Sequence, residues 1–124
     1  MAKFANDLVM DAALDKIATA TTMHVNTSEP ATRAAAISDS LADVTLTAGD
    51  GNGDYTIANG DTNGRKITVA EQVDVPIDAT GTATHVSLID GSDLILVTTC
   101  TSQGLTSGGT VTVGAFDDEI SDPS

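Results

Sequence analysis

Apolar side chains recur at helical spacing near the start of the chain. Six of them within residues 5–18 fall on one broad stripe, and this pattern predicts a helix whose stripe faces a core. The stripe consists of Ala5, Leu8, Val9, Ala12, Ala13 and Ile17. On the other side, the carboxylates of Asp7, Asp11 and Asp15 form a column with four-residue spacing. Like charges on an exposed helix face repel mildly and stay hydrated, so the column indicates a solvated face rather than an acid–base pair.

The rest of the chain is rich in strand patterns. A short strand is predicted at 22–26, and a second helix at 31–37 because Pro30 suits a first helical turn. From residue 44 onward Thr and Val dominate and Gly and Asp interrupt them, which is typical of short strands joined by turns. The predicted strands span residues 44–47, 54–59, 65–70, 72–77, 83–90, 93–100 and 110–116. Turns are predicted at dipeptides that accept positive φ at little steric cost: Asn63-Gly64, Asp90-Gly91 and Gly108-Gly109.

Side-chain alternation predicts which strand residues are buried. Within 84–88 it directs Val86 and Leu88 inward and His85 and Ser87 outward. The run LILV at 94–97 is continuously apolar. It predicts a strand buried on both faces, one of them covered by the N-terminal helix or by a neighbouring subunit.

These elements predict a mainly β (α+β) fold, an antiparallel β-sandwich or open barrel with an N-terminal helix packed on it. The length of 124 residues suits one domain. We therefore expect an N-terminal helical segment or arm at 1–20 and a single β-rich domain at 21–116. Residues 117–124, DDEISDPS, are acidic and small, and predict an exposed C-terminal tail.

Charge and composition narrow the classes of partner. The net charge of −13 repels phosphate backbones and anionic lipid, so we expect neither nucleic acid nor a membrane as a partner. Aromatic residues make up only 2% of the chain, which suggests a thin core that a neighbouring subunit helps to bury. A single cysteine, Cys100, excludes an internal disulfide and fits a reducing compartment. Acidic residues interrupt the N-terminus where a secretory signal needs an apolar stretch, and no window approaches the ~18 apolar residues of a membrane span.

The segment GDGNGDY at 49–55 is a candidate calcium loop. Asp50, Asn52 and Asp54 alternate as calcium ligands do, and Asp61 occupies the twelfth position. The sixth position is Tyr55 where the loop needs Gly, the twelfth lacks the bidentate Glu, and strands flank the segment. Asn and Asp also tolerate left-handed backbone and bond their own amides, so we interpret the segment as a turn and expect neither metal nor cofactor.

Other catalytic patterns are weak. His24, His85 and Cys100 carry no local signature of a nucleophile beside a base, and a thiol at the end of a buried strand behaves as a small hydrophobe. The glycine-rich segments GDGNGD and SGG have acidic residues or strands where a phosphate loop has Lys or a helix. The sequence therefore predicts a protein that is not an enzyme.

Four segments resemble a known family when they are taken together over nearly the full length. They are MAKFANDLVMDAALDKIA, MHVNTSEPAT, YTIANGDTNGRKITVA and DATGTATHVSLIDGSDLILVTTCTSQGLTSGGTVTV. In these segments the chain resembles small proteins of tailed bacteriophages that are encoded among head and tail structural genes. The resemblance implies a place in the virion rather than a reaction, and it carries over no functional residue.

Among virion roles we favour a capsid decoration (cement) protein. It would bind the outer surface of the assembled shell and stabilise contacts between major capsid subunits, through aliphatic burial and strand pairing. The segment 1–20 and the tail 117–124 are the candidate clamping arms. The expected partners are the major capsid protein and further copies of this chain, as a trimer. The expected location is the capsid surface, after assembly in the host cytoplasm.

Two alternatives stay open. The chain could be a tail, neck or head-fibre component, which few copies per particle would indicate. A different class is a calcium-dependent host-binding module that uses Asp50, Asn52, Asp54 and Asp61.

Overall fold

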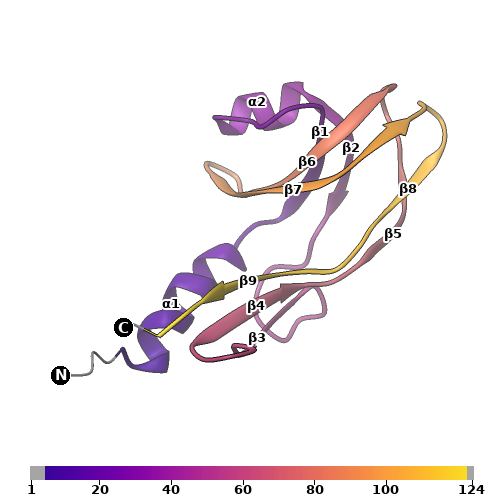
Figure 1. Cartoon of the computed structure of the whole chain (residues 1–124). Helices are drawn as coiled ribbons and strands as arrows, with labels where there is room; N and C mark the ends of the chain where they lie inside the picture. The colour runs from indigo at the N-terminus through magenta and orange to yellow at the C-terminus, as the bar shows by residue number, and fades with distance from the viewer. Residues whose placement is uncertain (1–4, 123–124) are drawn as a thin grey trace. The chain divides into compact units, whose positions relative to one another are not determined.

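The structure, a computed structural model, describes residues 5–122 (Figure 1). Its strands pair antiparallel in three sheets, and a helix precedes them, so the predicted mainly β (α+β) fold is confirmed. The helices are α1 (Asp7–Ile17) and α2 (Arg33–Ser38), and the strands are β1 (Thr22–Asn26), β2 (Ser40–Thr45), β3 (Tyr55–Asn59), β4 (Arg65–Val69), β5 (Gln72–Pro76), β6 (Gly81–Ile89), β7 (Leu94–Leu105), β8 (Thr110–Val113) and β9 (Phe116–Ile120).

The chain divides into two compact units rather than into an arm, a domain and a tail. The first unit comprises Met1–Thr19, Thr47–Glu71 and Gly114–Ser124, and the second comprises Ala20–Leu46 and Gln72–Val113. Apart from Ala20, both expected clamping arms therefore fall in the first unit. Residues 1–4 of one arm and 123–124 of the other lie outside the described residues.

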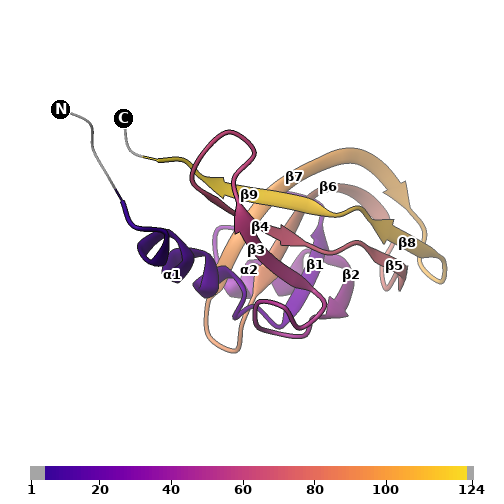
Figure 2. The same cartoon turned by 90° about the horizontal axis from the view of Figure 1, so that it is seen from below.

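In the second unit, a sheet of order β2-β1-β6-β7 and a β5-β8 ribbon form two layers (Figure 2). β1 lies between β2 and β6, with Val25 opposite Ala42 on one side and Val86 on the other. Aliphatic side chains from the sheet and from the ribbon meet in a shared core: Val25, Leu41, Ala42, Val75, Ile77, Ala83 and Leu105. The ribbon thus covers one face of the sheet.

The other face of this sheet is covered by α2, which contradicts the prediction that Ser87 points outward. Ser87 is fully buried, and its hydroxyl donates to Asn26 Oδ1 (2.6 Å). Asn26 is also fully buried, and its Nδ2 donates to the Ala36 carbonyl oxygen of α2 (2.8 Å). Val86 and Leu88 are buried as predicted. Alternation correctly separates the two faces, but helix packing buries the polar face as well.

β7 is the edge strand of this sheet, which contradicts the prediction that residues 94–97 are buried on both faces. These four side chains are only half-buried. β7 pairs with β6 on one side, and no strand within residues 5–122 pairs with it on the other. It also continues to Leu105, five residues beyond the predicted end.

In the first unit, α1 packs on the β3-β4-β9 sheet. The helix is close to the predicted range, and the Asn6 side chain caps it by accepting from the Leu8 N–H (2.9 Å). Its buried residues are Met10 and Leu14, whereas Leu8 and Val9 are 75% and 65% exposed. The predicted apolar stripe is therefore mostly the outer face.

The column of Asp side chains explains part of why the helix turns a different face to the sheet from the one predicted. Asp11 is half-buried because its carboxylate accepts from Arg65 Nε of β4 (2.7 Å), while Asp7 and Asp15 are exposed as expected. The Asp11 side-chain hydrogen bond is the main reason that the pKa of Arg65 is raised. This ion pair and the larger Met10 and Leu14 side chains orient the helix on the sheet.

β9 corrects the expected tail. Residues 116–120 pair antiparallel with β4, with Phe116 opposite Val69 and Ile120 opposite Arg65. Thr68 Oγ1 donates to Asp117 Oδ1 (2.6 Å), and Lys66 Nζ lies 3.6 Å from Asp117 Oδ2. Lys66 and Thr68 of β4 thus bind an acidic residue of the neighbouring strand. This pairing is not visible in the local sequence of residues 116–120.

The turn at Gly64 confirms the expected positive φ. Gly64 joins β3 to β4 with φ of 71°, and a Cβ atom there would collide with the Ile120 carbonyl at the end of β9. Glycine is required here for backbone conformation and for the close approach of β9.

We expect Gly64→Ala to lower the free energy of unfolding by at least about 1–2 kcal/mol, because alanine is strained at positive φ and its Cβ collides with backbone. Gly114→Ala is the matched control in the same unit, since its Cβ would meet nothing within 4 Å. Urea unfolding followed by circular dichroism measures both. Equal stability of the two variants would contradict the role of Gly64.

Candidate interaction surface

The calcium candidates of the 49–54 loop close the loop with their side chains. Asp50 Oδ1 accepts from the Ile57 N–H (2.8 Å), and Asp54 Oδ2 accepts from the Thr47 N–H (2.6 Å). Asn52 Nδ2 donates to the Ala48 carbonyl oxygen (2.8 Å). These hydrogen bonds are those of a turn in which Asp and Asn oxygens satisfy backbone amides.

The fourth candidate, Asp61, lies in the next loop and not in this one. Its carboxylate accepts from Lys66 Nζ (2.7 Å). Gly49, Gly51 and Gly53 carry φ values of 102°, 81° and 114°, which let the first loop turn sharply. Within residues 5–122, no three or more His, Cys, Asp or Glu side chains are grouped as a metal site requires.

His24 is buried on the α2 side of β1 and is paired with a serine that sequence reasoning missed. His24 Nδ1 lies 2.8 Å from Ser40 Oγ, and Ser40 Oγ donates to the Ala42 carbonyl oxygen (3.0 Å). Because the hydroxyl proton is used there, we assign the imidazole proton to Nδ1, which donates to Ser40. A catalytic serine needs the opposite arrangement, with the histidine accepting its proton. The pair is therefore structural.

The pKa of His24 is lowered, mainly because burial disfavours the charged imidazolium. The Asp43 carboxylate raises it and the Arg33 guanidinium lowers it, both less strongly than burial. His24 is consequently held neutral in the native state to a lower pH than in the unfolded chain.

His85 and Cys100 likewise form no nucleophile–base pair. His85 Nδ1 lies 2.9 Å from the hydroxyl of its neighbour Thr84. Burial raises the pKa of the Cys100 thiol, so the reactive thiolate is disfavoured. Cys100 packs against the aliphatic core of the second unit, as a small hydrophobic side chain does.

No protein-family model, curated protein or solved structure matches this chain. Among the described residues, no helix has the length and apolar character needed to cross a bilayer.

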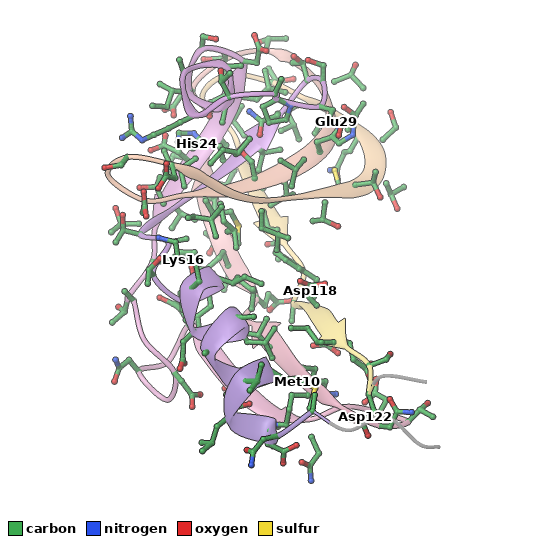
Figure 3. The ribbon with its side chains drawn as sticks, turned by 90° about the vertical axis from the view of Figure 1, so that its left-hand side faces the viewer. Met10, Lys16, His24, Glu29, Asp118 and Asp122 are labelled. Carbon is green, nitrogen blue, oxygen red and sulfur yellow. The ribbon has the colours of Figure 1, made fainter. Side chains whose placement is uncertain are left out.

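The outer face of α1 is the clearest exposed apolar surface in the first unit. Leu8 and Val9 project from it, and Ala12 and Ala13 continue it along the helix. In Figure 3, the labels of Met10 and Lys16 mark this helix, and Asp118 marks β9 of the same unit. Exposed aliphatic side chains that cluster on one helix face are typical of a contact with another macromolecule.

β9 offers a second, chemically different surface. It is an edge strand with the acidic residues Asp117, Asp118 and Glu119 in sequence. Asp117 and Glu119 are both exposed, and Asp117 also accepts a hydrogen bond from Thr68 of β4. A strand edge of this charge suits a basic partner strand and opposes another copy of itself.

We expect Asp54→Ala to lower the free energy of unfolding by about 1 kcal/mol, since the Thr47 N–H loses its acceptor. Asp54→Asn keeps an acceptor oxygen and should lose less. If the Asp54 carboxylate only closes the turn, each substitution should lower the melting temperature by the same amount with and without millimolar calcium. A calcium-dependent rise in the melting temperature of the wild type that Asp54→Asn removes would instead establish a calcium site.

The His24 environment predicts a pH dependence of stability. Above about pH 6.5, the unfolded-state pKa, both states hold a neutral imidazole. Below it the unfolded chain binds the proton first, so the free energy of unfolding falls until the pH reaches the lowered native pKa. We expect the stability of the wild type relative to His24→Gln to decrease as the pH falls below about 6.5 in urea unfolding. A difference that stays constant with pH would contradict the lowered pKa.

Proposed function

We propose that this chain is a non-enzymatic structural protein of a tailed-phage virion, a decoration protein that binds the outer surface of the assembled capsid and stabilises contacts between major capsid subunits. The observation that carries the proposal is the exposed aliphatic face of α1, with Leu8 and Val9 75% and 65% exposed beside a packed inner face. The buried side chains of α1 are Met10 and Leu14, so the exposed Leu8 and Val9 are not required for packing the helix within its own unit. The outer face is thus available to a partner.

The electrostatics of the first unit suit a basic partner. Asp7 and Asp15 are exposed on α1, and β9 presents Glu119. A capsid surface with an aliphatic groove bordered by Lys or Arg would complement both the helix face and the acidic strand edge. Such a surface would seat segments from both chain regions that the sequence suggested as clamping arms.

The contact area is small, and this fits a repeated assembly. Two exposed aliphatic side chains and two alanines bury too little area for one tight site. On a lattice of identical subunits, modest contacts multiply by valency. Binding that is selective for the assembled shell stabilises the shell by mass action, as any ligand selective for one state does.

The resemblance of the four sequence segments to small phage structural proteins supports the same proposal. The arrangements of His24, His85 and Cys100 described above offer no alternative chemistry. The 49–54 loop uses its Asp side chains for its own backbone, which weakens the competing hypothesis of a calcium-dependent host-binding module.

The test uses DNA-filled capsids of the phage that encodes the chain, prepared without this protein. Added wild-type protein should co-sediment with the capsids and raise the temperature at which they release DNA. The double variant Leu8→Asp/Val9→Asp should lose at least about tenfold in affinity, because charged side chains cannot be buried on the capsid. Both positions are exposed, so its fold should persist.

The matched control is Thr110→Asp/Thr112→Asp. It adds the same charge at exposed positions of β8 in the second unit. It should bind capsids as the wild type does, at equal ionic strength. Wild-type protein that neither binds capsids nor raises their DNA-release temperature would refute the decoration role, and equal loss in both double variants would refute the role of α1.

A further inference from the structure

The outer edge of β7 is the longest open strand edge among the described residues that carries no charge. β7 has 12 residues and pairs with β6 alone. A row of unpaired N–H and C=O groups on such an edge is a template for another strand. Charged side chains, which natural proteins use to prevent this pairing, are absent from β7.

The uncharged stretch is long for so acidic a chain. No Asp, Glu, Lys or Arg occurs from residue 94 to residue 116, although the net charge is −13. Within it, the four aliphatic side chains at 94–97 are half-buried, so a substantial part of their area meets solvent. Two copies that repel each other elsewhere can therefore approach along this stretch without placing like charges together.

The other edges are less suited to pairing with themselves. β9 would place Asp118 and Glu119 against their own copies. The free side of β2 is partly covered, because the Leu41 carbonyl oxygen accepts from the Asp78 N–H (2.7 Å) and Ala42 bridges Ile77. β8 is uncharged but has only four residues.

We propose that β7 pairs antiparallel with β7 of a second copy of this chain about a two-fold axis, which joins the two β2-β1-β6-β7 sheets into one. A two-fold contact places a strand against itself, so its side chains must be compatible with their own copies. Thr, Val, Leu and Ile meet this condition, and β-branched side chains pair well across antiparallel strands.

The ladder with β6 indicates where the axis lies. Its register shifts between Leu88 and Ile89 and again between Ala83 and His85. Residues 96–99 of β7 form the regular stretch between these shifts, opposite residues 85–88. Pairing centred near this stretch gives a dimer, in place of the trimer suggested by the sequence. The proposal does not depend on the capsid role.

The test uses charge at Thr99, an exposed residue at the end of the regular stretch. The wild type should sediment as a concentration-dependent dimer in analytical ultracentrifugation at physiological salt. Thr99→Lys and Thr99→Glu should each raise the dimer dissociation constant at least about tenfold, because each charge would lie beside the paired strand and close to its like-charged copy across the axis. Mixed in equal amounts, the two variants should form a heterodimer, because opposite charges then meet.

Thr112→Lys is the matched control, since it adds the same charge to β8, and it should leave the dimer unchanged. Circular dichroism establishes that each variant is folded. A wild type that stays monomeric up to about 1 mM, or that forms trimers, would overturn the proposal. So would a dimer that Thr112→Lys dissociates while Thr99→Lys does not.

Discussion

Eighteen acidic side chains in 124 residues must stay in water or beside a cation, and this constraint governs how the elements of both units place their faces. The described residues bury the polar side chains of His24, Asn26 and Ser87 and the phenol of Tyr55, but no Asp or Glu side chain. The half-buried Asp11 carboxylate is met by the basic Arg65 side chain between α1 and β4. Apolar residues form the core of the second unit, and uncharged residues make up the open edge of β7.

The same constraint gives many Asp side chains a structural task. Asp50 and Asp54 accept backbone amides in the 49–54 loop, and Asp90 Oδ1 accepts from the amides of Ser92 and Asp93 in the β6–β7 turn. At exposed sites, a carboxylate that accepts from backbone amides takes the place of the water molecules that would otherwise bind them. An acidic, glycine-rich loop can thus resemble a cation site in sequence while its oxygens are used by the backbone.

The surfaces that remain open are of two kinds, and they suit two kinds of contact. The α1 face and the β9 edge combine aliphatic area with negative charge, which favours a different, basic partner. The β7 edge combines open backbone with neutral side chains, which favours an identical partner. The two proposed contacts therefore use different residues, one set in each unit.

The sequence by itself determined the local elements. Helical spacing located α1, and turn residues around Thr- and Val-rich runs located β1, β3, β4 and β5 within a residue or two. It also assigned Asp50 and Asp54 to a turn, because the signals for that turn are contained in adjacent residues.

Only the tertiary structure decided which faces are buried and which edges are open. α1 turned Leu8 and Val9 outward because Met10, Leu14 and the Asp11–Arg65 ion pair face β4 and the rest of its unit. Ser87 became buried because α2 covers its side of the sheet, and the acidic residues 117–119 became part of a strand because β4 pairs with them. Burial depends on which segment, distant along the chain, lies opposite a residue, and periodicity carries no information about that neighbour.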